Sequence, residues 1–213
     1  MKKIIHQVFF NIGLKPFGER QDYKNNIKLI KKMNPTWAYK LWNDESANEF
    51  VEEYYPEHVK TWYSFIHPMY KVDYIRYLIL DHYGGIYIDL DETPIKPLDF
   101  YITSSKIITG TWYSASKKKF IEHNNNIIAI NDKKLTKDLI KYVGEQIIEK
   151  KKSIPACWKC RLFQHSVGQR CFTRWCKKNK HFSDINTLNY FETTNLKNNC
   201  SWLTSFGKKN PNN

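Results

Sequence analysis

Apolar side chains recur at helical spacing between residues 68 and 83, which predicts an amphipathic helix. The apolar stripe consists of Val72, Ile75, Leu78, Ile79, Leu80 and Tyr83. Two glycines, Gly84 and Gly85, follow directly. Glycine adopts the left-handed backbone conformation at little steric cost, so we expect this pair to end the helix.

The segment that follows the glycines, Ile86–Asp91, alternates between apolar and polar side chains. A period of two predicts a strand that carries Asp89 and Asp91 on the same face. Two carboxylates at a strand end offer the oxygen ligands that a hard divalent cation such as Mn2+ or Mg2+ prefers. Asp73 and Arg76, three residues apart on the helix, share one side of it, and we expect them to face the same crevice. Each feature alone is common in surface turns and ion pairs, so their occurrence in one run is what favours a functional site.

The same two periods predict the other elements of the chain. The expected helices are Asp22–Met33, Ser46–Tyr55, Val59–Phe65, Leu135–Lys151 and a helical segment Val167–Cys176. The expected strands are Lys3–Phe10, Thr36–Asp44 and Ser105–Trp112, and Glu122–Ile130 is expected to form a turn and then a strand.

The chain of 213 residues and 25.5 kDa is long enough for one domain with a sizeable core. We expect this single domain to span residues 1–206. The tail, residues 207–213, has the composition of a linker, which is compatible with further domains in a longer polypeptide.

The net charge of +13 suits a nucleic acid, an anionic membrane surface or a small ligand that carries phosphate. Much of the excess lies in short lysine clusters on polar segments, such as Lys117–Lys119, which indicates solvated surface, so we expect no nucleic-acid partner. No apolar run approaches the roughly 20 residues of a membrane-spanning helix, and the N-terminus lacks the pattern of a signal peptide. The expected location is therefore the cytoplasm.

The five cysteines are Cys157, Cys160, Cys171, Cys176 and Cys200. An odd number argues against a fully paired secreted framework. The first four are spaced in a way that a zinc knuckle would also use. Because the second pair lies in a segment that looks helical, free thiols are the favoured interpretation and structural zinc the alternative.

The run from His67 to Asp99 resembles the core motif of the DXD sugar transferases of glycosyltransferase family 32, and of the related catalytic domains of glucosylating toxins. The matching residues are Asp73, Arg76, Gly84, Gly85, Tyr87, Asp89, Asp91 and Pro94. The resemblance extends over most of the chain and implies a GT-A fold, an α/β fold with a mixed, mainly parallel sheet flanked by helices.

The bias towards Asn, Lys and Ile suggests an AT-rich genome, such as that of a large DNA virus.

This resemblance implies that the chain is a metal-dependent, retaining glycosyltransferase, and it assigns the catalysis to four residues. Asp91 would bind Mn2+ or Mg2+ directly, and Asp89 would bind it directly or through water. Arg76 would face the sugar and the diphosphate of the donor. Asp73 would accept hydrogen bonds from sugar hydroxyls.

The resemblance also implies where the donor binds. Gln7, Val8 and Phe9 on the first strand would contact the base, with Phe9 in the place of a tryptophan that stacks on uracil. A phenylalanine ring offers the same flat face, so the expected donor is a UDP-sugar. Asn125 or Asn126 would hold the donor sugar.

Near the C-terminus the family has a metal-binding histidine a few residues before Ser-Trp. Here Ser201 and Trp202 are present, and the tryptophan would close over the phosphates. The histidine is absent, and Asn198 or Asn199 would supply an oxygen ligand to the metal instead. The expected acceptor is a glycan or another hydroxyl group.

Two other functions fit part of the same residues. The segment DLDET, residues 89–93, also matches the DxDxT motif of haloacid-dehalogenase phosphatases, in which the first aspartate is phosphorylated. That interpretation needs a long apolar strand before the motif and a downstream acidic pair, and neither is evident. A non-catalytic sugar-binding or nucleic-acid-binding module would require the two aspartates to have lost their role.

Overall fold

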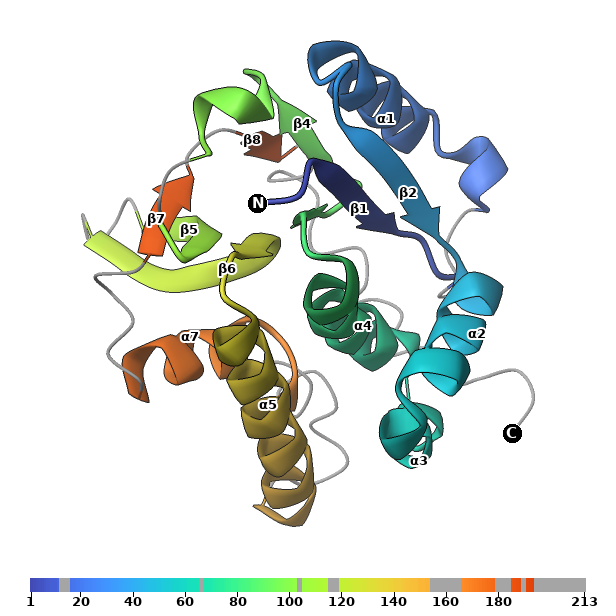
Figure 1. The fold of residues 1–213 in the computed structure, drawn as a ribbon, viewed down its shortest axis with the longest axis vertical. Coiled ribbons are helices and arrows are strands. Elements are labelled where there is room, and N and C mark those ends of the chain that lie inside the picture. Colours follow the sequence, from blue (N-terminus) through green and yellow to red (C-terminus); the bar gives the residue numbers. More distant parts are fainter. Residues whose placement is uncertain are drawn as a thin grey trace.

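The structure, a computed structural model, describes residues 1–11, 16–65, 67–102, 105–114, 119–153, 166–178, 185–188 and 191–193. Six strands form one mixed sheet in the order β2-β1-β3-β6-β5-β7 (Figure 1). The strands are β1 (Ile4–Val8), β2 (Ala38–Trp42), β3 (Ile86–Ile88), β5 (Ile107–Ser114), β6 (Lys119–Ile130) and β7 (Ile185–Leu188). The pairs β1–β2, β1–β3 and β5–β7 are parallel, and β6 runs antiparallel to both of its neighbours. The predicted mixed, mainly parallel α/β sheet is thereby confirmed.

Helices cover both faces of this sheet. They are α1 (Gln21–Met33), α2 (Asp44–Tyr54), α3 (Val59–Tyr63), α4 (Pro68–Tyr83), α5 (Lys133–Ser153) and α7 (Gln169–Lys178). Short 3-10 turns lie at Phe17–Glu19, Pro56–His58 and Leu98–Phe100. A second, two-stranded sheet pairs β4 (Glu92–Pro94) with β8 (Phe191–Thr193).

Alternation along the strands divides the interior into two apolar layers. One face of the sheet contributes Val8, Tyr87 and Ile128 to a large core shared with α2, α4, α5 and α7. The other face contributes Ile86 and Ile88 to a smaller core that α1 covers. Figure 1 shows α1 and α4 on opposite sides of β1.

The predicted helix at residues 68–83 is confirmed to the residue, as is its end at the double glycine. Gly84 has a φ of 68° and Gly85 a φ of 83°, both in the left-handed region. A side chain on Gly85 would also collide with the backbone of Ile4 on β1, whereas Gly84 has more space around it. The glycines therefore let the chain turn sharply and enter the sheet directly beside β1.

The strand predicted for Ile86–Asp91 is wrong in its second half. β3 ends at Ile88, and Asp89 and Asp91 lie in a turn that leads into β4. The turn is closed by a hydrogen bond from the backbone N–H of Glu92 to the backbone oxygen of Asp89, at 3.2 Å. We call residues 89–93 the DXD turn. β6 differs from expectation too, because the predicted turn at its start is part of a single strand that is long enough to pair with both β3 and β5.

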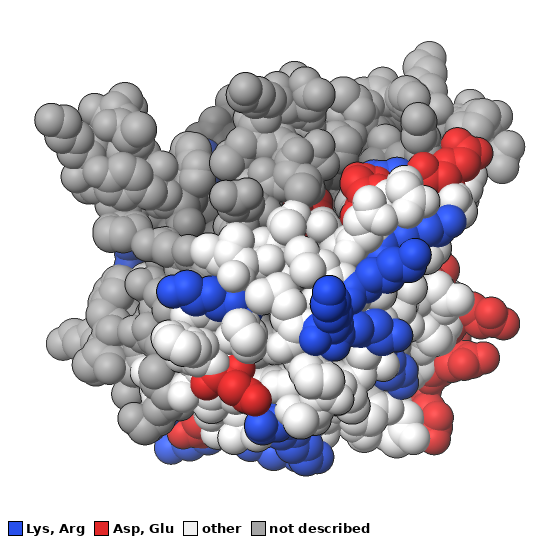
Figure 2. All heavy atoms as spheres, turned by 90° about the horizontal axis from the view of Figure 1, so that it is seen from above, with Lys and Arg blue, Asp and Glu red and all other residues white. Residues whose placement is uncertain are grey.

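Part of the positive charge lies on exposed faces of the described structure, whereas the side chains of Lys117–Lys119 lie outside the described residues. Figure 2 shows a band of Lys and Arg side chains on the face seen from the top of Figure 1, where α1 lies. On α1 itself Lys28, Lys31 and Lys32 are exposed, while Asn26 and Ile30 on the other side are buried. None of the described helices combines the length and the apolar character needed to span a bilayer.

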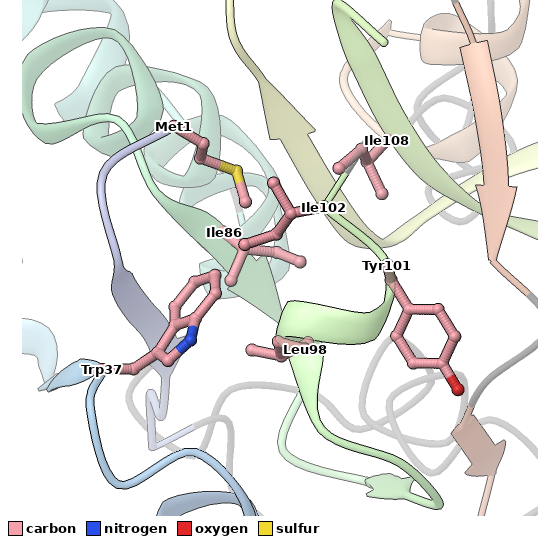
Figure 3. A pocket seen from close by; sticks show the side chains of 7 residues that line it. All are labelled: Met1, Trp37, Ile86, Leu98, Tyr101, Ile102 and Ile108. Atoms are coloured by element: carbon pink, nitrogen blue, oxygen red, sulfur yellow. The ribbon is translucent and has the colours of Figure 1, made fainter. Parts of the chain in front are cut away.

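A small apolar pocket with an empty volume of about 180 Å³ lies under the sheet face that α1 covers (Figure 3). Its lining residues are Met1, Trp37, Ile86, Leu98, Tyr101, Ile102 and Ile108. Ile86 is the first residue of β3, so the pocket lies at the opposite end of that strand from the DXD turn. Its lining offers almost no polar groups, and we do not regard it as a site for a charged ligand.

Candidate functional site

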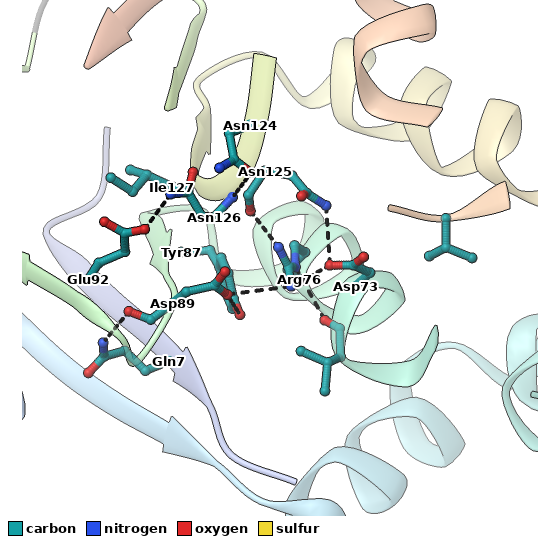
Figure 4. Close-up of polar contacts among 12 residues, drawn as sticks. Gln7, Asp73, Arg76, Tyr87, Asp89, Glu92, Asn124, Asn125, Asn126 and Ile127 are labelled. Atoms are coloured by element: carbon teal, nitrogen blue, oxygen red, sulfur yellow. Dashed lines mark hydrogen bonds and ion pairs between the residues drawn. The ribbon is translucent and has the colours of Figure 1, made fainter. Parts of the chain in front are cut away.

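A buried ion pair on α4 forms the centre of the candidate site (Figure 4). The carboxylate of Asp73 and the guanidinium of Arg76 are in contact, and their side chains are only 6% and 3% exposed. Arg76 also lies 3.5 Å from a carboxylate oxygen of Asp89 in the DXD turn. The structure thus brings Asp73, Arg76 and Asp89 together, as expected for the first aspartate of the DXD turn.

The guanidinium of Arg76 is held on several sides. It donates to the backbone oxygen of Asn125 at 2.5 Å and to that of Val72 at 3.3 Å, and it lies 4.4 Å from the centre of the Tyr87 ring. Burial is the largest single influence and lowers the pKa of the guanidinium, but Asp73, Tyr87 and Asp89 together outweigh burial and raise this pKa above its ordinary value. Arg76 is thus a fixed positive charge in an apolar interior.

Burial also raises the pKa of Asp73, to about 6, although the charge of Arg76 opposes that rise. The Asp73 carboxylate further accepts a hydrogen bond from the side-chain amide of Asn125, at 3.2 Å. The same amide donates to the hydroxyl of Tyr77 at 3.0 Å. Asn125 therefore links α4 to β6, and its amide nitrogen already has two partners within the protein.

The neighbouring Asn126 contacts the DXD turn. Its backbone oxygen accepts from the backbone N–H of Asp89 at 2.7 Å, and its side-chain amide donates to the carboxylate of Glu92 (Figure 4). Its side-chain oxygen accepts from the N–H of Ile127 at 3.0 Å. Both asparagines named by the resemblance thus lie at the candidate site, but within the described structure each connects protein segments to one another.

The acidic residues of the DXD turn crowd together. Burial is the main reason that the pKa of Asp91 rises to about 6, with the charge of Asp89 second. The pKa of Glu92 rises to about 8, first through burial and then through Asp91. Asp89 accepts a hydrogen bond from the Tyr87 hydroxyl at 2.5 Å, and its side chain is 29% exposed.

Such an arrangement suits a divalent cation, because a bound cation would offset both the cost of burying these carboxylates and their mutual repulsion, and would favour their ionised forms. The donors fit a hard cation in kind, since all are carboxylate oxygens. Within the described part of the chain, however, no three His, Cys, Asp or Glu side chains converge as a complete ligand set. Asp89 and Asp91 would hold the cation together with groups from the ligand or from residues outside that part.

The predicted base-binding residues on β1 behave differently from one another. Gln7 is fully buried, and its amide donates to the backbone oxygen of Asp89 at 3.2 Å and accepts from the Tyr39 hydroxyl at 2.8 Å. Val8 is buried in the large core. Phe9 is half-buried, and its ring lies 5.1 Å and 6.2 Å from the rings of Phe17 and Tyr23. Of the three side chains, Phe9 is the one that is not fully buried.

Sequence reasoning missed Asn26, which lies buried on the inner face of α1. Its amide donates to the backbone oxygen of Leu90 at 3.0 Å, and its side-chain oxygen accepts from the Thr93 hydroxyl at 3.0 Å. One feature of the sequence points to it. Asn26 is an uncharged polar residue one helical turn before Ile30, on the inward side of an otherwise basic helix.

Several predicted residues lie outside the described residues, namely Asn198, Asn199, Ser201, Trp202, Cys157, Cys160 and Cys200. The other two cysteines, Cys171 and Cys176, are free thiols buried in α7. Burial raises the pKa of each thiol to about 12, which keeps both protonated. The zinc alternative depends on the pair outside the described part and stays a prediction.

Residues 20–111 match a family described as the glycosyltransferase sugar-binding region containing a DXD motif. The chain resembles the DXD glycosyltransferases. It is 39% identical over 97 residues to mannosyl phosphorylinositol ceramide synthase SUR1 of Saccharomyces cerevisiae, a match that covers 46% of this chain and 24% of that protein. The chain thus spans about a quarter of the length of this curated relative.

Solved structures of glycosyltransferases share the fold. The PaToxG glycosyltransferase superimposes with a TM-score of 0.61 at 16% identity, over 84% of this chain and 69% of that one. The UDP-bound glycosyltransferase domain from the YGT toxin superimposes with a TM-score of 0.51 at 9% identity, over 90% and 80% of the two chains. The fold is therefore that of GT-A glycosyltransferases, and the resemblance to DXD sugar transferases stated from the sequence is confirmed.

Proposed function

We propose that this chain transfers a sugar from a nucleoside diphosphate donor, for which a UDP-sugar is the first candidate, to a hydroxyl group of an acceptor. The observation that carries the proposal is the buried pair of Asp73 and Arg76 directed at Asp89. A buried ion pair adds little to stability compared with apolar side chains of the same size, because both charges lose their hydration. Its presence beside an acidic turn is better explained by a ligand that carries hydroxyl and phosphate groups.

The chemistry of sugar transfer matches these groups. When the bond between sugar and diphosphate breaks, negative charge develops on the leaving phosphate, and fixed positive charge beside it lowers the barrier. Asp89 and Asp91 would hold Mn2+ or Mg2+, which supplies such charge when bound. Arg76 supplies a second positive charge, already oriented by Asp73 and Asn125 before the donor arrives.

The remaining roles follow from place and chemistry. Asp73 would accept hydrogen bonds from sugar hydroxyls, and Phe9 would stack on the base. Donor contacts from Asn125, Asn126, Ser201 and Trp202, and a metal contact from Asn198, stay predictions of the resemblance. Asp89 is not placed as an independent nucleophile, because Tyr87 and Arg76 hold its carboxylate. The resemblance to family 32 implies retention of the anomeric configuration, and without such a nucleophile retention would proceed by displacement on the front face of the sugar. The coupling constants of the product's anomeric centre test retention.

The names of the relatives suggest a refinement of donor and acceptor. SUR1 is named for the synthesis of a mannosyl lipid, so a mannosyl donor and a lipid-linked hydroxyl belong among the candidates to be tested. A single catalytic domain at residues 1–206 and a cytoplasmic location are further parts of the proposal, and limited proteolysis and cell fractionation test them.

A phosphatase acting through Asp89 is the competing function. A phosphoryl acceptor must approach its substrate freely, whereas the Asp89 carboxylate is bound by the Tyr87 hydroxyl and lies 3.5 Å from Arg76. The strand before it is only three residues long. The geometry therefore favours a role in binding a cation and a donor.

Isothermal titration tests the proposal. UDP and GDP are titrated into the wild type and into Asp91→Asn, with and without Mn2+. We expect binding of one nucleotide that requires the metal, and a loss in Asp91→Asn that exceeds the roughly 10- to 100-fold typical of residues that only support a ligand. Asp81→Asn is the control, because Asp81 is also a half-buried carboxylate but lies in the last turn of α4 and accepts from Tyr55.

Absence of nucleotide binding in the wild type under all conditions would overturn the proposal. Equal losses in Asp91→Asn and Asp81→Asn would show that the effect is structural. Hydrolysis of a phosphate ester with Mg2+ that disappears in Asp89→Asn would establish the phosphatase instead.

A further inference from the structure

The DXD turn is held partly by backbone pairing, since Glu92 and Thr93 pair with β8 and the Asp89 N–H donates to the backbone of Asn126. Side-chain amides bind it in addition. Gln7 from β1 donates to the backbone oxygen of Asp89, as described above. Asn26 from α1 donates to the next backbone oxygen, that of Leu90, and accepts from the Thr93 hydroxyl. From β6, Asn126 donates to the carboxylate of Glu92 (Figure 4). Amides from three separate elements thus fix the turn.

Asn26 is the least expected of these amides. It is only 5% exposed and lies on the side of α1 that faces the apolar layer under the sheet. An apolar residue would pack there without any need for a hydrogen-bond partner, and asparagine is also a weaker helix former than leucine. The cost is met because the turn occupies both polar atoms of its amide.

Asn26 contacts the chain on both sides of Asp91. The Leu90 oxygen precedes this aspartate directly, and Thr93 lies two residues beyond it, so one amide spans the stretch that carries the carboxylate. Groups that orient metal ligands from outside the coordination shell typically change metal affinity by about 10- to 100-fold when they are removed. Without such a group, part of the free energy of metal binding is spent on ordering the ligands, so the affinity for the metal falls.

We propose that Asn26 is a positioning residue, which holds the DXD turn in the conformation that binds a divalent cation before the cation arrives. The inference rests on the proposed function for the identity of the ligand. Its structural half, that Asn26 orders residues 89–93, can be tested without any ligand.

The same helix provides a matched control. Asn34 follows the last turn of α1 and is 3% exposed. Its amide donates to the backbone oxygen of Ile30 at 2.8 Å, and its side-chain oxygen accepts from the backbone N–H of Leu98 at 2.7 Å. Asn34 is thus as buried and as fully bonded as Asn26, but it holds a segment beyond β4.

The experiment compares Asn26→Leu, Asn34→Leu and the milder Thr93→Val, which removes one of the two bonds of Asn26. Hydrogen exchange is measured on the metal-free proteins at the amides of residues 89–93. The dissociation constant of Mn2+ is measured by titration in the presence of UDP. Thermal unfolding shows how much stability each variant loses.

For Asn26→Leu we expect faster exchange at residues 89–93 and Mn2+ binding weaker by about 10- to 100-fold, with UDP affinity restored near wild type at saturating Mn2+. Thr93→Val should show a smaller change in the same direction. Asn34→Leu should lose comparable stability but keep its Mn2+ affinity within about threefold. The proposal is overturned if Asn26→Leu binds Mn2+ as the wild type does, or if Asn34→Leu weakens Mn2+ equally.

The two measurements also separate this inference from the proposed function. If the wild type binds neither Mn2+ nor UDP, the proposed function fails, and the exchange data still decide whether Asn26 orders the turn. If Asn26→Leu does not fold, Thr93→Val decides both measurements, and unchanged exchange and Mn2+ affinity in that variant would reject the role.

Discussion

The two ends of β3 contrast in almost every physical respect. At its start, Ile86 lines a small pocket whose other walls are apolar (Figure 3). Just beyond its end, Asp89 lies within reach of Arg76 and is bonded to Gln7 and Asn126 (Figure 4). Only a few residues separate a region held by apolar packing from one held by charges and amides.

This difference indicates that the start of β3 stabilises the fold and that the region beyond its end suits binding. Burial of apolar surface stabilises the fold without regard to direction, so the start of the strand tolerates imperfect packing. The charged end gains little stability from its ion pair, and each polar group there needs a specific partner. A region that is costly to build and adds little stability is the place where a binding function is expected.

Of the variants considered, removal of Arg76 should have the largest effect on stability and on nucleotide binding. In Arg76→Leu the buried Asp73 loses its counter-charge, and we expect about 3–5 kcal/mol lower stability in chemical denaturation, together with loss of nucleotide binding. The double variant Asp73→Leu/Arg76→Leu should recover much of the stability but none of the binding. A double variant as unstable as Arg76→Leu would contradict this assignment.

Substitution of the two glycines before β3 should separate two costs of adding a side chain, namely the unfavourable backbone conformation and a steric collision. Both glycines have positive φ, so alanine at either costs about 1–2 kcal/mol. Gly85→Ala should cost about 3 kcal/mol in all, because its new methyl group also meets the backbone of Ile4, whereas Gly84→Ala meets its nearest neighbour at 3.9 Å. Urea denaturation of the two variants checks the order, and equal losses would mean that β1 shifts easily.

A pH effect is expected from His6 on β1, whose side chain is fully buried. Burial lowers its pKa to about 4. Its Nε2 lies 3.1 Å from the backbone oxygen of Gly84, and its Nδ1 accepts from the indole N–H of Trp42 at 3.3 Å. The unfolded chain binds a proton at this histidine below about pH 6.5, which the folded chain does not bind until about pH 4. Stability should therefore fall by about 2 kcal/mol between pH 7 and pH 5 on account of His6 alone.

Urea denaturation at the two pH values, compared with His6→Gln, measures this contribution of His6. The glutamine variant should lose less stability over the same range, since it has no proton to gain. An equal loss in both proteins would place the pH dependence elsewhere.

The smallest effect is expected at the apolar end. Ile86→Val removes one methylene group beside the pocket and should cost about 0.5–1.5 kcal/mol in thermal unfolding. Mn2+ and nucleotide affinity should stay unchanged, because no polar group of the DXD turn touches this residue. Weaker Mn2+ binding in Ile86→Val would show that the two ends of β3 are energetically coupled, contrary to this expectation.

Local patterns in the sequence determined much of this protein. The helix at residues 68–83, its end at the glycines, and the placing of Asp73 and Arg76 on one side of that helix follow from short-range patterns. The fold class came from the likeness of that run to DXD sugar transferases. These features could be predicted because helical and strand periods depend on neighbours along the chain.

The tertiary structure alone decided how the site is held. The pattern of Ile86–Asp91 favours a strand throughout, yet the strand ends at Ile88, and the backbone oxygens of Asp89 and Leu90 accept from the side chains of Gln7 and Asn26. Gln7, whose contact with a ligand stays a prediction, donates to the backbone oxygen of Asp89. Asn26, which no motif includes, lies 64 residues from the backbone oxygen that it binds. Such contacts depend on which elements meet across the core, and a local period of two or of 3.6 carries no information about distant partners.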